Sequence, residues 1–142
     1  MAAEVRAVLL SALLLLPAAA QAAVNAEDLV EIRAVINRQM EAFRRDDAPG
    51  AFALVSPGVQ QAFGTPERFL DVVRASYRAV YRPGSVAFLG LTVMGGDAVQ
   101  QVQITDASGA VWMAYYAMQR QRDGSWRTSG CHLVQPARTI PT

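Results

Sequence analysis

Residues 124–133 read GSWRTSGCHL, and the interpretation of the whole chain starts from this stretch. It follows Asp123-Gly124, a dipeptide that is a strong signal for a hairpin turn between two strands. The ring of Trp126 needs a packing partner. Cys131 and His132, near its end, are the only Cys and the only His of the chain. The pattern predicts a central strand that closes a β-sheet.

Three further strands are predicted before this one. From Ser85 onward, the period of the apolar residues changes from helical to alternating, and turn signals recur at regular intervals. The predicted strands are 86–94, 98–105 and 110–122. We expect Leu89, Leu91 and Val93 on one face of the first of them.

The second predicted strand carries Val102 and Ile104 on one face and Gln101 and Gln103 on the other. Polar residues that alternate in this way, Gln100 among them, either line a pocket or cover the solvent face of a sheet. Trp112, Met113 and Met118 lie on strands whose two faces are both fairly apolar, which indicates a sheet covered on both sides.

Residues 26–82 show helical periodicity instead. Asn25 can cap a first helix over 26–45 with Asp28 three residues on, and Asp46-Asp47 can cap a short second helix. Residues 59–64 are compatible with either a helical turn or an extended segment. Thr65-Pro66-Glu67 begins a third helix, which ends at Arg82-Pro83-Gly84. Its predicted buried stripe is Phe69, Val73, Tyr77 and Val80.

Helices first and an antiparallel meander second predict the α+β class, with N-terminal helices packed on a curved four-stranded antiparallel sheet. We expect one domain over residues 23–135. Residues 1–22 resemble a signal peptide with cleavage after Ala22, so the protein is expected to be periplasmic or secreted. The tail 136–142, with two prolines, is expected to be frayed. No membrane span is expected in the mature chain.

The charge balance argues against nucleic acid as the main partner, because the formal net charge is +1. Every one of the 13 basic residues is Arg, which we interpret as a compositional bias. A single Cys excludes an intramolecular disulfide.

Five fragments, in this order and spacing, carry a family resemblance: Ile36-x-x-Gln39-Met40-x-Ala42-Phe43-x-x-Asp46-Asp47, Ser56-Pro57, Phe63-Gly64-x-Pro66-x-x-Phe69, Tyr77-x-x-Val80-Tyr81-Arg82-Pro83 and Gly124-x-Trp126-Arg127-x-x-Gly130-Cys131. Over residues 30–134 the chain resembles the bacterial domain of unknown function 4864 family. The resemblance implies an exported protein with the cone-shaped nuclear transport factor two-like fold, also called cystatin-like. It implies no activity and assigns no catalytic residue.

Three residues are candidates for acid/base chemistry: Asp47, Tyr77 and His132. A carboxylate at the mouth of a cone, a phenol or an imidazole can each transfer a proton. Simpler structural roles compete with each assignment. Asp47 can cap a helix, Tyr77 can pack in the core, and His132 can lie at a hydrogen-bonded edge or on the surface.

Four residues are candidates for ligand binding: Arg78, Tyr81, Tyr116 and Cys131. Arg78 lies between Arg74 and Arg82 at a spacing of four, a pattern that can attract an anion or form a solvated helix face. Cys131 and His132 are adjacent on a strand and point to opposite faces, so they form neither a Cys/His pair nor a metal site. No cofactor is expected.

Three functional hypotheses remain open. The first is an exported domain that binds a small ligand or a protein partner in a sheet-lined pocket without chemistry. The second is an acid/base isomerase or dehydratase acting inside the cone. The third is a homodimeric structural or assembly domain that associates through the sheet face. Fold alone does not choose among them.

Overall fold

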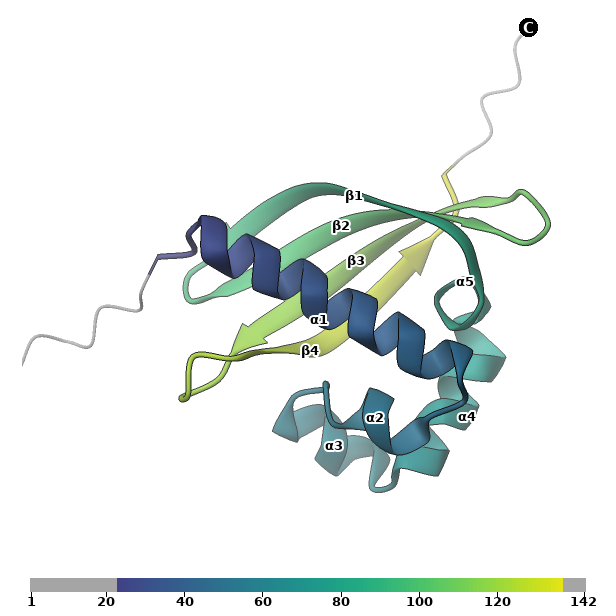
Figure 1. Cartoon of the computed structure of the whole chain (residues 1–142), viewed down its shortest axis with the longest axis horizontal. Helices are drawn as coiled ribbons and strands as arrows, with labels where there is room; N and C mark the ends of the chain where they lie inside the picture. Colours follow the sequence, from purple (N-terminus) through teal and green to yellow (C-terminus); the bar gives the residue numbers. More distant parts are fainter. Residues whose placement is uncertain (1–22, 137–142) are drawn as a thin grey trace, which may run out of the picture.

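Four antiparallel strands form one sheet whose spatial order, β1-β2-β3-β4, is the order of the sequence (Figure 1). The computed structural model describes residues 23–136, so the predictions for 1–22 and 137–142 lie outside the described residues. The elements are α1 Ala26–Arg44, α2 Ala48–Phe52, α3 Pro57–Phe63, α4 Pro66–Ser76, α5 Arg78–Tyr81, β1 Pro83–Met94, β2 Asp97–Asp106, β3 Val111–Arg120 and β4 Trp126–Val134. This confirms the predicted α+β class with helices before the sheet.

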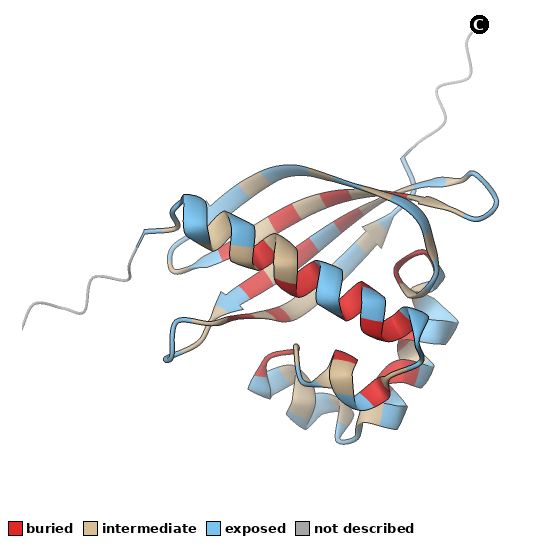
Figure 2. Cartoon of the chain, in the orientation of Figure 1, coloured by how far each residue is buried: buried red, intermediate tan, exposed pale blue. Residues whose placement is uncertain are grey.

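Helix α1 lies across one face of the sheet and presents its buried side to the strands (Figure 2). Its first turn is closed by the predicted capping box, in which the backbone N–H of Asp28 donates to Asn25 and that of Asn25 donates back to the Asp28 carboxylate. Ile32, Ile36 and Phe43 of the apolar stripe are fully buried. None of the described helices is long and apolar enough to cross a membrane.

Trp126 connects the start of α1 to the end of β3 and the beginning of β4. Its side chain is 2% exposed, and its indole N–H donates to Asp28 Oδ1 at 3.1 Å. Arg120 forms an ion pair with the other Asp28 oxygen at 2.6 Å and lies 4.8 Å from the Trp126 ring centroid. The Asn25 backbone N–H, together with Trp126 and Arg120, lowers the pKa of Asp28 below its usual value. The tryptophan is therefore a core residue.

Strand β4 closes the sheet but is an edge strand, so its predicted central position is wrong. Part of its edge is covered by the segment between α2 and α3. Val55 forms a parallel bridge with Thr128. The backbone N–H of Thr128 donates to the carbonyl oxygen of Leu54, and the backbone N–H of Ser56 donates to the carbonyl oxygen of Thr128, each at 2.9 Å. This pairing covers backbone groups that an open sheet edge would expose. It also brings the short helices against β4.

The prediction that Leu89 shares a face with Leu91 is wrong because β1 carries a bulge. Phe88 pairs with Val102 and Leu91 with Gln100, so β1 has one extra residue between these pairs. Phe88 and Leu91 pack against the core, whereas Leu89 is 36% exposed. The buried Gln100 amide stabilises the bulge by donating to the carbonyl oxygens of Leu89 and Gly90 at 3.0 and 3.3 Å.

The glutamines of β2 have different roles. Val102 and Ile104 are fully buried, and Gln101 and Gln103 lie on the opposite, half-buried face as predicted. Gln100 belongs to the inner face and serves the bulge. It therefore lines neither a pocket nor the solvent face.

The third predicted helix is interrupted at Tyr77. Helix α4 ends at Ser76, Tyr77 adopts φ −129° and ψ 48°, and α5 begins at Arg78. The break redirects the chain so that Ala79 and Val80 become buried and α5 packs against β1 and β2. The ambiguous segment before Gly64 is helical, and Ser56 caps it by accepting the Val59 backbone N–H.

Candidate functional site

A cavity of about 260 Å³ lies between the helices and strands β3 and β4. Its wall is mainly apolar and comes from elements far apart in sequence. The apolar lining includes Phe43 of α1, Phe63 of α3, Phe69 and Val73 of α4, Val80 of α5 and Val55. Concave, largely apolar cavities with a few polar groups are the usual form of small-molecule sites.

Phe69 is the centre of the aromatic cluster that forms one side of this cavity. Its ring centroid lies 5.3 Å from that of Phe63, 5.7 Å from Phe52 and 5.9 Å from Phe43. The four rings come from α1, α2, α3 and α4, and their tilted and edge-on arrangements are favourable for aromatic pairs. The cluster therefore joins the short helices to one another and to α1.

Tyr116 of β3 and Cys131 of β4 lie opposite each other in the cavity wall. They form a cross-strand pair, and both line the cavity. Tyr116 is 1% exposed, and its hydroxyl has no hydrogen-bond partner among residues 23–136. Burial raises the pKa of Cys131 to about 12. Burial, with Cys131 beside it, also holds the pKa of Tyr116 well above its usual value. Both groups are therefore protonated at neutral pH.

Gln39 and Thr128 are polar members of the same wall, and each has a partner. The Thr128 hydroxyl donates to Gln39 Oε1 at 3.3 Å, and Gln39 Nε2 donates to the Ala51 carbonyl oxygen at 3.3 Å. This chain of bonds links β4 to α1 and α2. It leaves the Tyr116 hydroxyl as the buried, unsatisfied polar group of the described lining.

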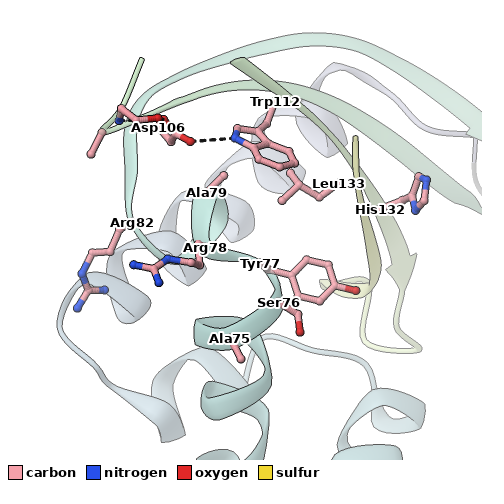
Figure 3. Close-up of a pocket in the computed structure, with 12 residues that line it drawn as sticks. Ala75, Ser76, Tyr77, Arg78, Ala79, Arg82, Asp106, Trp112, His132 and Leu133 are labelled. Atoms are coloured by element: carbon pink, nitrogen blue, oxygen red, sulfur yellow. Dashed lines mark hydrogen bonds between the residues drawn. The ribbon is translucent and has the colours of Figure 1, made fainter. Parts of the chain in front are cut away.

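A larger, more open groove of about 660 Å³ lies on the other side of Tyr77. Tyr77 lines both hollows, whereas Arg78 and His132 line the groove. Figure 3 shows Arg78 and His132 on opposite sides of the Tyr77 ring in this view. Tyr77, Arg78 and His132, three candidates from the sequence, therefore line one groove. Figure 3 marks no hydrogen bond among these three residues.

Asp106 also lines this groove, but its carboxylate is occupied by the β2–β3 turn. It accepts hydrogen bonds from the Ser108 hydroxyl at 2.6 Å, the Trp112 indole N–H at 3.0 Å (Figure 3) and the backbone N–H groups of Ser108 and Ala110. These bonds, that of the Ser108 hydroxyl first, lower the pKa of Asp106 to about 2. A carboxylate with such a low pKa is a poor proton acceptor at neutral pH.

We expect Asp106→Asn to destabilise the fold at neutral pH and much less near pH 2. Since the folded-state pKa lies below that of an unfolded carboxylate, about 3.9, ionised Asp106 stabilises the fold above about pH 4. That contribution is lost as the pH falls toward 2. Urea denaturation of wild type and variant between pH 7 and 2 measures the difference, with Asp97→Asn, at the other end of β2, as the matched loss of a carboxylate. A difference that is constant over this range would contradict the assignment.

Asp47 and Tyr81 are placed away from both hollows. The Asp47 carboxylate caps α2 by accepting the Gly50 backbone N–H at 3.0 Å, which is the structural role that competed with catalysis. The Tyr81 hydroxyl donates to Asp46. Neither residue lines the cavity or the groove.

Asp46 forms ion pairs with two of the three arginines that were predicted to share a helix face. Arg82 lies 3.2 Å and Arg74 3.8 Å from its carboxylate. Hydrogen bonding by Tyr81, with the two arginines nearby, lowers the pKa of Asp46. Arg78 does not join this group and lines the open groove instead. The sequence offered Asp46-Asp47 as a carboxylate at the mouth of the cone or as helix caps, and it did not predict an ion-pair cluster around Asp46.

The chain matches the family model described as Domain of unknown function (DUF4864) over residues 25–140. A comparison with curated proteins finds no match. Among solved structures, an NTF-2 like protein of unknown function from Silicibacter pomeroyi is 18% identical, with a TM-score of 0.54 over 78% of this chain and 97% of the other. A protein of unknown function with a cystatin-like fold from Nostoc punctiforme is 12% identical, with a TM-score of 0.55 over 79% and 93%.

A ketosteroid isomerase-like protein from Erwinia carotovora has 16% identity and a TM-score of 0.53 over 80% of this chain and 100% of the other. At these identities the likeness shows a shared fold, the NTF2-like or cystatin-like fold, and no shared activity.

Proposed function

The chain belongs to the DUF4864 family and has the NTF2-like fold, and from this premise we propose that it is a binding module that holds a small ligand in its sheet-lined cavity without converting it. The observation that supports this most is the composition of the cavity wall. Phenylalanines and valines surround one unsatisfied hydroxyl, that of Tyr116.

The cavity is large enough for a small organic molecule. Its volume of about 260 Å³ exceeds the roughly 150 Å³ of an engineered apolar cavity that holds benzene. Apolar walls favour a ligand that buries carbon surface, and the gain is roughly 25 cal/mol for each Å² removed from water. One polar group in such a wall orients the ligand.

The same wall argues for binding over chemistry. The described lining of the cavity contains no carboxylate, imidazole or guanidinium. The Cys131 thiol stays protonated because burial raises its pKa to about 12, and a protonated thiol is a poor nucleophile. Asp47 and His132, two of the three acid/base candidates, do not line the cavity.

The acid/base alternative is best supported in the outer groove, where Tyr77 and His132 both line the wall. The isomerase-like neighbour from Erwinia carotovora has the same fold. Reproducible turnover by the purified protein, abolished by Tyr77→Phe or His132→Asn, would favour this alternative over binding without conversion.

The homodimer alternative has its own observation, on the outer face of the sheet. Val111, Tyr115 and Val134 are apolar side chains there with more than a third of their surface exposed. Sedimentation analysis at high protein concentration tests it. A dimer would support an assembly role in addition to ligand binding. A monomer would exclude an assembly role that depends on self-association.

The binding proposal is tested by filling the cavity from within. Cys131→Leu adds apolar volume at a position that lines the cavity and should block a cavity ligand while leaving the fold intact. We expect NMR titration of wild type with cyclohexanone to perturb the signals of cavity residues and the variant to show no such change. His132→Leu, on the neighbouring and exposed position of β4, is the matched control. Equal responses of all three proteins would contradict the proposal.

We also propose export, based on residues 1–22 of the sequence. Mass spectrometry of the protein recovered from the periplasm or medium should give an N-terminus at Ala23. Recovery of the intact chain from the cytoplasm alone would overturn this part of the proposal.

A further inference from the structure

We propose that the ligand of the inner cavity is an uncharged, ring-sized molecule with a carbonyl oxygen that accepts a hydrogen bond from the Tyr116 hydroxyl. This inference rests on the proposed binding function and names the chemical class of its ligand. It follows from the hydrogen-bond balance, the charge and the volume of the cavity.

The Tyr116 hydroxyl is buried and unsatisfied. Tyr116 is 1% exposed, and its oxygen is buried without a hydrogen-bond partner in the described chain. A buried polar group left unpaired destabilises a protein by roughly 1–3 kcal/mol, so buried hydroxyls nearly always have a partner. Tyr116 lies in the cavity wall, so a ligand bound against this wall would be the missing partner.

Tyr116 and Cys131 both offer a hydrogen to a ligand in the cavity. The neutral phenol of Tyr116 is an O–H donor, and the protonated thiol of Cys131 is a weak S–H donor. The two residues are a cross-strand pair of β3 and β4 that lines one cavity. A carbonyl oxygen has two lone pairs, so it can accept from both groups at once. The nearby amide of Gln39 is already bonded to Ala51 and Thr128.

The described lining of the cavity does not suit a charged ligand. The described lining holds no charged side chain. Arg74 and Arg82 are exposed and pair with Asp46 outside the cavity. A carboxylate or ammonium group in this cavity would lose its hydration without gaining a counter-charge, which is strongly unfavourable. The volume of about 260 Å³ further limits the ligand to one or two rings.

The test compares three probes of one shape. Cyclohexyl methyl ketone carries the carbonyl, ethylcyclohexane lacks it, and cyclohexanecarboxylate carries a charge. Binding of each to the wild-type protein is measured by NMR titration at pH 7. We expect the ketone to bind about tenfold more tightly than the hydrocarbon, the increment of one net hydrogen bond, and the carboxylate to bind most weakly.

Tyr116→Phe should remove the preference for the ketone and leave the affinity for ethylcyclohexane unchanged or higher. The ligand-free variant should be as stable as the wild type or more stable, because it loses an unpaired hydroxyl and keeps the ring. Tyr115→Phe is the matched control: Tyr115 is the preceding residue, lies 39% exposed on the other face of β3, and should change neither affinity nor stability.

The outcomes separate the two proposals. If no probe perturbs cavity residues, the proposed binding function fails. If ketone and hydrocarbon bind equally, or if the carboxylate binds best, the cavity binds ligands but the inference about their class is overturned. A less stable Tyr116→Phe variant with unaltered preference for the ketone would also overturn it, since the hydroxyl would then serve the fold.

Discussion

Trp126→Ala is expected to lower the free energy of unfolding by about 3–5 kcal/mol, the usual cost of truncating a fully buried aromatic ring. The ring is 2% exposed, so the variant leaves a void at the junction of α1, β3 and β4. It also removes the indole N–H that donates to Asp28 and the ring beneath the Arg120 guanidinium. The Asp28–Arg120 ion pair then loses the packing that shields it from water.

Urea denaturation followed by far-ultraviolet circular dichroism measures this effect. Trp126→Phe is the informative control because it keeps most of the ring volume and removes the bond to the charged Asp28 carboxylate, which is worth roughly 1.5–3 kcal/mol. Trp112→Ala, at a half-buried position of the same sheet, should have a smaller effect than Trp126→Ala. A change below about 1 kcal/mol for Trp126→Ala would show that the ring is not a core element.

Local patterns in the sequence predicted the elements well where local chemistry determines them. The capping residues Asn25, Asp47 and Thr65 each accept a backbone N–H at the start of the helix predicted for them. The change from helical to alternating period correctly separates α5 from β1. Within the sheet, alternation assigned Val102 and Ile104 to the buried face.

The errors have tertiary causes. Leu89 was misplaced because the β1 bulge depends on the amide of Gln100 from the next strand, and alternation within β1 carries no sign of it. The helix break at Tyr77 has no Gly or Pro to announce it, and it serves the packing of α5 on β1 and β2. The edge position of β4 has a different origin, because the last strand of the order β1-β2-β3-β4 has only one neighbour; a central position was inconsistent with the predicted meander itself.

The cavity was predicted only in outline. The strand pattern named Tyr116 and Cys131 as candidates, and the structure places both in the cavity wall. The sequence pattern did not predict the aromatic side of the cavity. Phe43, Phe63 and Phe69 come from three helices and meet only in the folded chain. Asp46 was missed as the centre of an ion-pair cluster for the same reason, since Asp46, Arg74 and Arg82 come from separate parts of the chain and meet only in the folded protein.

Phe69→Ala is expected to destabilise the protein by about 3–5 kcal/mol and to act first on the short helices. Phe69 is 7% exposed and its ring contacts one phenylalanine from each of α1, α2 and α3. Helices α2 and α3 have 5 and 7 residues, and helices this short are unstable without tertiary packing. Removing the central ring therefore weakens the whole helical side of the cavity.

Amide hydrogen exchange distinguishes this regional effect from uniform destabilisation. Protection in α2, α3 and α4 should fall well before protection in β2 and β3, because the sheet keeps its own core of Val102, Ile104 and Ala114. Phe63→Ala, at the half-buried end of α3, is the matched control with a smaller expected loss. Equal loss of protection in helices and strands would show that the helical layer unfolds only together with the sheet. Selective loss of protection in the helices would instead mean that the helical side of the cavity opens while β3 with Tyr116 and β4 with Cys131 remain folded. Such an opening would give a ligand a route into the cavity.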